Sequence, residues 1–274
     1  MQINSSGQYA GLAGEDEETN MVHFVGAGPG APDLLTVRGK QLLENADVLI
    51  YAGSLVNPEL LAYTKDSCTV HDSAKMTLEE VIGVMEQAEA AGLDTVRLHT
   101  GDPCIYGAIR EQMDALDARK IPYDYCPGVS AFCGAAAALN LEYTLPGISQ
   151  SVIITRMAGR TAVPPGESIR SFAAHQATMV FFLSAGMPDE LAGQLMEGGC
   201  RPDTPAAIVY RATWPDEETF ICTVETLAET ARENQITKTA LIIVGEVVKT
   251  TAYSRSKLYD PGFATAYRRR SEPL

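Results

Sequence analysis

The chain has 274 residues, of which 46% are hydrophobic, and its formal net charge at pH 7 is −14. Such a chain can bury one large core or two modest ones, and we expect two small domains. The acidic balance excludes general nucleic-acid binding, because phosphate contacts require a basic surface. No apolar run reaches the roughly 18–20 residues of a membrane-spanning helix and the start lacks a signal peptide, so we expect a cytoplasmic protein without membrane contact.

The six cysteines form no CxxC pair, and the four histidines show no zinc-like spacing. We therefore expect reduced thiols and no metal site. Residues 1–20 are polar, rich in glycine and finally acidic, so they cannot bury enough apolar surface to order themselves. They are interpreted as a disordered extension.

From Met21 onward, short apolar strands alternate with longer amphipathic stretches, which is typical of an α/β fold. In the first half the predicted strands are 22–25, 48–52, 96–100 and 123–126, and the predicted helices are 36–45, 78–91, 108–119 and 130–139. Each strand is followed by a crossover, so this sheet should be largely parallel.

A turn signal at Leu145-Pro146-Gly147 predicts a domain boundary, with an N-terminal α/β domain over 21–146 and a C-terminal one over 147–249. In the second half the predicted strands are 151–155, 178–183, 206–211, 219–222 and 240–245, and the predicted helices are 188–197 and 226–234. This pattern indicates a mixed sheet with fewer helices. Residues 250–274 form a polar tail.

The segment Gly26-Ala27-Gly28-Pro29-Gly30-Ala31 fits GxGxxA directly after a strand, which alone is a weak indication of dinucleotide binding. In a dinucleotide fold the third small residue already lies in a helix, whereas Pro32 and Asp33 follow here. The second strand ends in Tyr51-Ala52-Gly53, without an acid for a ribose. Because Pro29 stiffens the loop and removes a donor, a neutral or cationic ligand suits it better than phosphate, and a turn without ligand stays open.

Ligands of open α/β sheets bind outside the carboxyl ends of the strands. There the segment 100–107, TGDPCIYG, carries two glycines, an acid and an aromatic residue, and the segment 126–131, CPGVSA, leads into a helix of small residues. Structural alternatives exist for each candidate. Asp102 could cap the following helix, Ser130 is a good N-cap, and Tyr106 could be core packing.

These spaced motifs together resemble a known family. GAGPG at 26–30, TGDPCIYG at 100–107, PGVSA at 127–131 and TALIIVGEVV at 239–248 are similar to motifs of the tetrapyrrole, or uroporphyrin-III C-methyltransferase-like, methylases, and the resemblance covers 21–248. Within the family, four further segments resemble those of the precorrin-4 C11-methyltransferases. They are YAGSLV at 51–56, ITRMAGRTAVP at 154–164, YRATWPDE at 210–217 and KLYDPGF at 257–263.

The resemblance implies a two-domain α/β fold, each domain a parallel or mixed sheet flanked by helices, with the active-site cleft between them. It also implies S-adenosylmethionine as methyl donor, S-adenosylhomocysteine as product, and a homodimer that methylates C11 of precorrin-4 or cobalt-precorrin-4 in cobalamin biosynthesis. No residue need ligate cobalt, so both substrates fit.

By this resemblance, the first domain lines the cofactor site with Pro29, Thr100, Gly101, Asp102, Ile105, Tyr106, Ser130 and Ala131. The second domain contributes Leu183, Tyr210, Ala212, Thr239 and Ala240. At Leu183 and Ala212 some related methylases carry methionine and glycine, but the apolar or small character is kept.

Methyl transfer depends mainly on orientation, because a macrocycle carbon attacks the sulfonium methyl in line. No nucleophile is therefore predicted, and Asp102, Tyr106 and Glu217 are the candidates for a general base. The substrate is a polycarboxylate that an acidic chain repels, so local arginines must hold it. Arg156 and Arg160 could present guanidinium groups to ring carboxylates, and solvated surface arginines are the alternative.

Two other functions fit the same residues. One is a methylase of this fold that acts on another corrin carbon or on a siroheme precursor. The other is a binding module without turnover, which would bind S-adenosylhomocysteine and methylate no tetrapyrrole. The position of the new methyl group separates the first from C11 methylation, and the absence of transfer identifies the second.

Overall fold

The computed structural model describes residues 20–250 and 252–270, so the extension predicted over 1–20 lies almost wholly outside the described residues. Its contacts divide the chain into two compact units. The first unit comprises 20–28 and 32–129, and the second comprises 29–31 and the described residues from Ser130 onward. The second unit therefore begins well before the boundary predicted at residue 146, because the helix over 131–138 packs with the second sheet.

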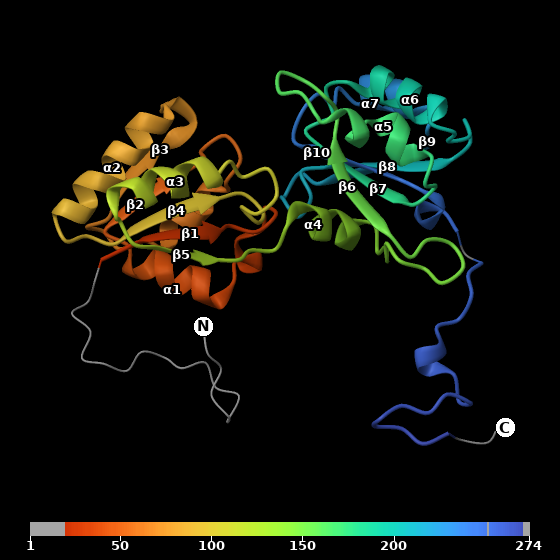
Figure 1. Cartoon of the computed structure of the whole chain (residues 1–274), viewed down its shortest axis with the longest axis horizontal. Coiled ribbons are helices and arrows are strands. Elements are labelled where there is room, and N and C mark those ends of the chain that lie inside the picture. The colour runs from red at the N-terminus through yellow and green to blue at the C-terminus, as the bar shows by residue number, and fades with distance from the viewer. Residues whose placement is uncertain (1–19, 251, 271–274) are drawn as a thin grey trace. The chain divides into compact units, whose positions relative to one another are not determined.

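The first unit is built on a five-stranded sheet in the order β3-β2-β4-β1-β5, in which every neighbouring pair is parallel (Figure 1). Its strands are β1 (Val22–Gly26), β2 (Val48–Tyr51), β3 (Thr69–Asp72), β4 (Thr95–His99) and β5 (Tyr123–Cys126). The predicted parallel sheet is confirmed. The sequence analysis missed β3, an edge strand whose first residues are exposed and which lacks an apolar run.

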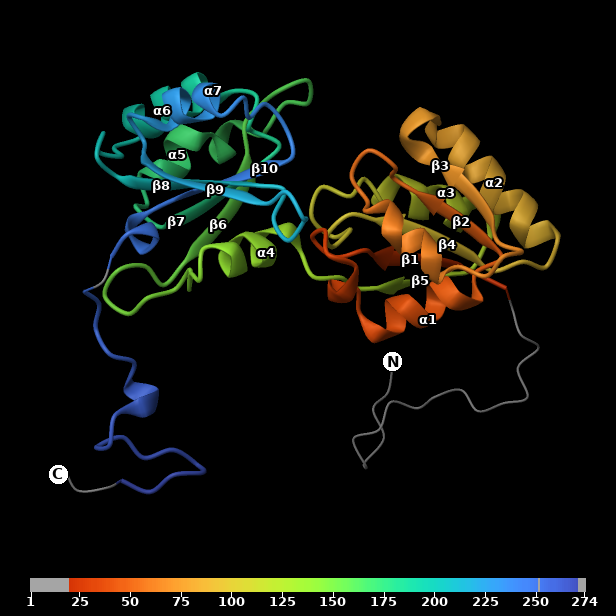
Figure 2. The ribbon, with the colours of Figure 1, turned by 180° about the vertical axis from the view of Figure 1, so that it is seen from behind.

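Helices cover both faces of this sheet, with α1 (Val37–Asn45) on one face and α2 (Leu78–Ala90) and α3 (Arg110–Arg119) on the other (Figures 1 and 2). Helix α2 begins at a capping box, in which Thr77 Oγ1 accepts from Glu80 N and Glu80 Oε2 accepts from Thr77 N. Short 3-10 turns occur at Pro32–Leu34, Pro58–Tyr63 and Ser73–Lys75.

The second unit contains a five-stranded sheet in the order β6-β7-β10-β8-β9. Its strands are β6 (Val152–Arg156), β7 (Thr178–Phe182), β8 (Pro205–Tyr210), β9 (Glu218–Thr223) and β10 (Ala240–Val244). The pair β6–β7 is parallel and the other pairs are antiparallel, which confirms the mixed sheet.

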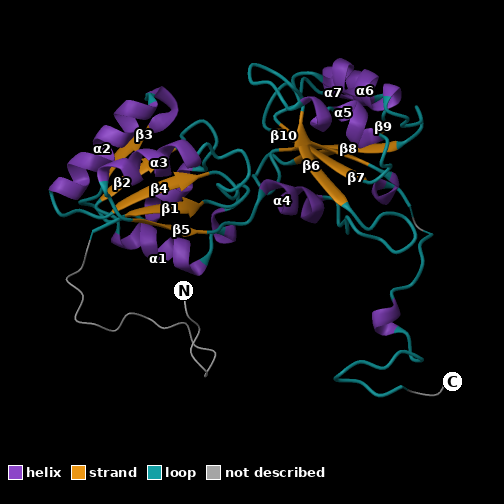
Figure 3. Cartoon of the chain, viewed as in Figure 1, coloured by secondary structure: helices purple, strands orange, loops and turns teal. Residues whose placement is uncertain are grey.

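Helices α5 (Ile169–Ala173), α6 (Pro188–Glu197) and α7 (Leu227–Glu233) lie on one face of this sheet, and α4 (Ala131–Ala138) lies on the other (Figure 3). The sequence analysis predicted α6 with these bounds but missed α5, because five residues are too few to show a helical period. Further 3-10 turns lie at Pro165–Glu167, Glu246–Val248 and Lys257–Tyr259.

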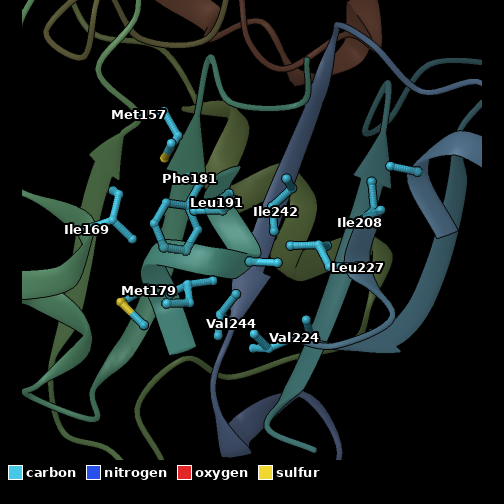
Figure 4. Close-up of a cluster of buried hydrophobic side chains, with 14 of the residues drawn as sticks. Met157, Ile169, Met179, Phe181, Leu191, Ile208, Val224, Leu227, Ile242 and Val244 are labelled. Atoms are coloured by element: carbon cyan, nitrogen blue, oxygen red, sulfur yellow. The ribbon is translucent and has the colours of Figure 1, made fainter. Parts of the chain in front are cut away.

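The larger core of the second unit lies between its sheet and helices α5 to α7. Phe181 at its centre is fully buried, with Met179 beside it on β7 and Ile242 on the neighbouring strand β10 (Figure 4). Leu191 of α6 and Leu227 of α7 close the core from the helix side. The cluster is formed by apolar side chains of the sheet and of the three helices, which hold these elements together by close packing.

Two features of the remaining chain bear on the sequence analysis. The described part of the polar tail is organised locally by Arg268, whose guanidinium group donates to the carbonyls of Leu258 and Asp260, both at 2.8 Å. Among the described residues, no helix combines the length and the apolar content that a membrane span requires.

Candidate active site

Three loops of the first unit meet at the carboxyl edge of the parallel sheet. Gly26 ends β1, Gly101 follows β4 and Gly128 follows β5. Gly28 and Gly101 bond to each other through their backbones at 3.2 and 2.8 Å. A Cβ on Gly26 would stand 2.6 Å from Gly128 N, and one on Gly128 would overlap the Gly101 carbonyl. Close packing of loop against loop therefore requires glycine at 26 and 128.

Asp102 fastens two of these loops together. Its carboxylate accepts from Cys104 N at 2.9 Å, from Gly128 N at 2.9 Å and from the Tyr125 hydroxyl. Burial alone would raise the pKa of Asp102, but the hydrogen bonds from Cys104, Tyr125 and Gly128 together lower it below its ordinary value. Because α3 begins only at Arg110, the helix-capping alternative is wrong. Asp102 is therefore an ionised carboxylate that already accepts three hydrogen bonds, and its role as general base stays a prediction.

Tyr106 stands in the same loop with a left-handed backbone, at φ 57°, and its side chain is 44% exposed. The core-packing alternative for Tyr106 is therefore wrong. A left-handed conformation is uncommon outside glycine and is found preferentially at functional sites. The next residue but one, Ala108, is also left-handed at φ 50°. The loop thus holds an aromatic ring at the surface at the expense of backbone strain.

The second unit shows the same combination at one edge of its sheet. Strand β10 is antiparallel to β7 and β8, so its first residue lies beside the ends of both. The cofactor residues that the resemblance assigned to the second domain gather there, namely Leu183, Tyr210, Ala212, Thr239 and Ala240. Leu183 is left-handed at φ 51° and 68% exposed, and Thr239 is left-handed at φ 56°. Arg211 N donates to Thr239 O at 2.9 Å and joins two of the loops.

Residues 29–31 of the glycine loop belong to the second unit, although the resemblance assigned Pro29 to the first domain. The Trp214 indole donates to Pro29 O at 3.2 Å, and Ala31 N donates to Thr213 Oγ1 at 2.9 Å. A Cβ on Gly30 would overlap the Trp214 ring. Glycine at this position is therefore required by an aromatic side chain far along the sequence.

Ser130 and Ala131, which the resemblance assigned to the first domain, also lie in the second unit. Ser130 is buried at the N-cap of α4, as predicted, but its side chain makes no capping hydrogen bond in the described structure. The hydroxyl therefore contributes less to the helix than an ordinary serine cap does.

Glu217 has a structural contact in the same loop. Its carboxylate accepts from Thr213 N at 2.6 Å. The Arg211 guanidinium stacks 4.2 Å from the Trp214 ring centre and pairs with Asp216 at 2.6 Å. These contacts close the loop over 211–217. A role of Glu217 as general base stays a prediction.

The two arginines predicted to hold the substrate differ in the structure. Arg156 donates to the carbonyls of Met157 at 3.1 Å, Thr161 at 3.0 Å and Ala162 at 3.0 Å, so most of its donors shape its own loop. Arg160 lies exposed in that loop and has no hydrogen bond or ion pair with the residues described. Arg156 thus holds the loop in shape, and Arg160 is the arginine of this loop whose guanidinium group is not engaged by described residues. The substrate role of both arginines stays a prediction.

The sequence analysis missed two polar residues on β4. Arg97 and His99 point to one face of this central strand and are 7% and 6% exposed. Arg97 Nε donates to Gln112 Oε1 at 3.1 Å, and Nη1 donates to Ile50 O at 3.3 Å. The alternation of Thr95, Arg97 and His99 was the available signal. Polar residues at every second position predict a strand with one exposed face, whereas the polar face of β4 is buried.

Both side chains line a pocket of about 290 Å³ in the first unit. The pocket is lined by Ala52, Leu55, Ser73, Met76, Thr77, Leu78, Val81, Arg97, His99, Thr100, Ile105, Tyr106, Gly107, Ala108, Glu111 and Gln112. Burial lowers the pKa of Arg97 to about 10, which leaves the guanidinium charged at neutral pH. Burial and the Arg97 charge lower the pKa of His99 to about 3, so the imidazole is neutral. Within 20–250 and 252–270 no cluster of His, Cys, Asp or Glu is arranged to hold a metal.

Two α/β units, with glycine-packed loops at the edge of one sheet and left-handed loops at the edge of both, define a protein of the tetrapyrrole methylase type. Residues 21–228 match the family model of the tetrapyrrole (corrin/porphyrin) methylases, and the chain belongs to this family. A cobalt-precorrin-4 C(11)-methyltransferase of Methanocaldococcus jannaschii is 50% identical over 253 residues, which is 92% of this chain and 98% of that protein.

Solved structures agree with this family. A cobalt precorrin-4 methyltransferase superposes with a TM-score of 0.82 at 42% identity, over 84% of this chain and 96% of the other. The uroporphyrin-III C-methyltransferase of Thermus thermophilus in complex with S-adenosylhomocysteine gives a TM-score of 0.71 at 29% identity, over 84% of this chain and 99% of the other.

Proposed function

We propose that this protein transfers a methyl group from S-adenosylmethionine to C11 of precorrin-4, or of its cobalt form, in cobalamin biosynthesis. The observation that carries the proposal is the 50% identity to the M. jannaschii enzyme over nearly the full length of both chains. By the family resemblance, we also propose that it works in the cytoplasm as a homodimer. Sedimentation of the purified chain as a monomer would contradict the last point.

The loops support S-adenosylmethionine as the donor. Tyr106 and Leu183 offer exposed apolar surface on strained backbone, while Gly26 and Gly128 pack loops rather than leave a phosphate cradle. Such a lining suits a cationic sulfonium nucleoside, which supplies an activated methyl group when bound. The related T. thermophilus enzyme was solved with S-adenosylhomocysteine. We propose that the cofactor contacts Pro29, Thr100, Gly101, Asp102, Ile105, Tyr106, Ser130, Ala131, Leu183, Tyr210, Ala212, Thr239 and Ala240.

The residues of the chain then act by binding and orientation. Holding two reactants in line is equivalent to effective molarities that lower a barrier by roughly 7 kcal/mol or more. The Asp102 carboxylate is already engaged by three protein donors and Glu217 closes its own loop. We therefore propose that placement of the two reactants, rather than acid–base chemistry by either carboxylate, supplies most of the rate enhancement.

The decisive experiment incubates the enzyme with precorrin-4 or cobalt-precorrin-4 and a donor whose methyl group is labelled with carbon-13. Mass spectrometry should show one added methyl, and carbon NMR should place it at C11. A label on another ring carbon would favour the related methylase of different regiochemistry. Tight binding of S-adenosylhomocysteine without transfer to either substrate would favour a binding module.

A further inference from the structure

Arg97, a buried positive charge in the first unit, has no acidic side chain within ion-pair distance among the residues that the structure describes. Only 7% of the surface of Arg97 is exposed, and none of the ion pairs among the described residues includes it. Its two hydrogen bonds go to neutral acceptors, Gln112 Oε1 and Ile50 O. A buried charge without a partner of opposite sign is costly, and natural proteins pair such groups or use them.

The neighbouring imidazole is also unsatisfied. His99 Nε2 is inaccessible to water and makes no hydrogen bond with any described residue. The ring packs against Phe24 with the ring centres 6.2 Å apart, and this contact offers no polar partner. Leaving a buried polar nitrogen unpaired is costly. Arg97 and His99 are therefore two adjacent polar groups on one strand face that both lack a partner.

The size of the pocket limits what can enter it. Its volume of about 290 Å³ is close to the lower end of ligand pockets, which span roughly 300–1,000 Å³. A water molecule takes about 30 Å³ of liquid volume, so the space exceeds what one or two waters fill. A tetrapyrrole is far too large to be enclosed, but one of its short carboxylate arms is not.

We infer that this pocket receives a carboxylate arm of the substrate, with Arg97 as its ion-pair partner and His99 in the wall beside it. The inference rests on the proposed function, because the substrate class supplies the carboxylates. Ile105 and Tyr106, which we propose to contact the methyl donor, form part of the wall, so an arm bound here lies next to that loop. Glu111 also lines the pocket and is exposed.

The methionine part of the cofactor also carries a carboxylate, so the test must separate the two sources. Arg97→Met removes the charge and keeps an apolar side chain of similar length. Arg110→Met is the matched control, because Arg110 lies on α3 with a 71% exposed side chain and pairs only with surface carboxylates. Uroporphyrin III, an unreactive octacarboxylate, serves as a fluorescent probe for the macrocycle, and S-adenosylhomocysteine serves as the cofactor probe in calorimetry.

We expect Arg97→Met to weaken uroporphyrin binding and to raise KM for precorrin-4 by about 10- to 100-fold, as loss of one charge-assisted hydrogen bond predicts. S-adenosylhomocysteine affinity should not change, and Arg110→Met should match the wild type in every assay. The melting temperature of Arg97→Met should hold or rise, since replacing an unpaired buried charge by an apolar group is often neutral or stabilising.

Equal uroporphyrin affinity in the two variants would overturn the inference, as would a loss confined to S-adenosylhomocysteine. If Arg97→Met fails to fold, Arg97→Gln provides the second test, because it removes the charge and keeps polar atoms; it should weaken uroporphyrin binding by a similar factor with the cofactor affinity intact. Uroporphyrin binding does not depend on turnover. A protein that binds uroporphyrin through Arg97 but methylates no substrate would refute the proposed function and would still support the inference about the pocket.

Discussion

The two units bury different kinds of polar groups. The buried polar side chains of the first unit are Asn57, Thr95, Arg97, His99 and Gln112, and those of the second are Ser130, Thr155, Thr178, Ser184 and Thr204. The second set consists of hydroxyls, which can satisfy themselves locally. Ser184 Oγ, for example, donates to Phe182 O at 2.7 Å and accepts from Met157 N at 2.9 Å.

In the described structure, the first unit has Thr95 Oγ1 and His99 Nε2 buried on its central strand without partners, whereas the one such atom of the second unit, Arg268 Nε, lies in the tail and outside the core clusters. Unpaired groups of this kind reduce stability, and stability is commonly given up where a protein binds a ligand. The larger core cluster of the second unit is formed by apolar side chains, and Leu183 and Thr239 stand in left-handed loops at the edge of its sheet. Both units therefore have left-handed loops at an edge of the sheet, but only the sheet of the first unit also buries unpartnered polar atoms among the described residues.

The largest expected effect tests the core of the second unit. Phe181→Ala should lower the free energy of unfolding by about 3–5 kcal/mol, because Phe181 is fully buried among apolar side chains. Ile221→Ala on β9, where the side chain is exposed, is the control and should cost less than about 1 kcal/mol. Urea unfolding measures both. A loss below about 1 kcal/mol for Phe181→Ala would mean that this core is loosely packed.

Acid should destabilise the first unit through His99. The folded pKa of about 3 lies below the roughly 6.5 of an unfolded histidine, so the unfolded chain binds a proton that the folded unit excludes. The stabilising contribution is complete above about pH 6.5 and is lost as the pH falls toward 3. Hydrogen exchange at pH 7 and 5 should show this loss in β4, and His99→Gln should reduce it. The exposed His175→Gln variant of the second unit should behave like the wild type.

Asp102→Asn tests the junction of the loops. An amide cannot accept from Cys104 N, Gly128 N and the Tyr125 hydroxyl together, since one of its two polar atoms is a donor. We expect a loss of about 1–3 kcal/mol in thermal or urea unfolding. Asp114→Asn, on the surface of α3, is the control and should stay within about 0.5 kcal/mol. Equal stability of the two variants would show that the three contacts do not hold the loops together.

The smallest expected effect concerns the strained edge of the second unit. Leu183→Gly should relieve the left-handed backbone and raise stability by up to about 1 kcal/mol, because glycine adopts this conformation freely. It should also weaken S-adenosylhomocysteine binding, since the exposed apolar side chain is lost. Leu183→Ala keeps the strain, so it should weaken binding without raising the melting temperature. A glycine variant with full affinity would remove Leu183 from the cofactor site.

Local pattern in the sequence determined much of the fold. Apolar strands separated by crossovers predicted the parallel sheet, and turn residues with a helical period predicted α6 from Pro188 to Glu197. The spaced motifs predicted the family and gathered Leu183, Tyr210 and Thr239 into one site, and the structure places these three at a single edge of the second sheet. Each of these predictions follows from residues close together in the chain or from motifs in a fixed order.

Only the tertiary structure decided which side of a strand is buried and which distant groups meet. Arg97 and His99 alternate with apolar residues as a half-exposed strand would, and they became buried because β4 lies between two other strands under helices. Asp102 faces Tyr125 and Gly128 rather than a helix end, and residues 29–31 belong to the second unit through Trp214. Periodicity reports the local face of an element, whereas burial and hydrogen-bond partners depend on which elements pack around it.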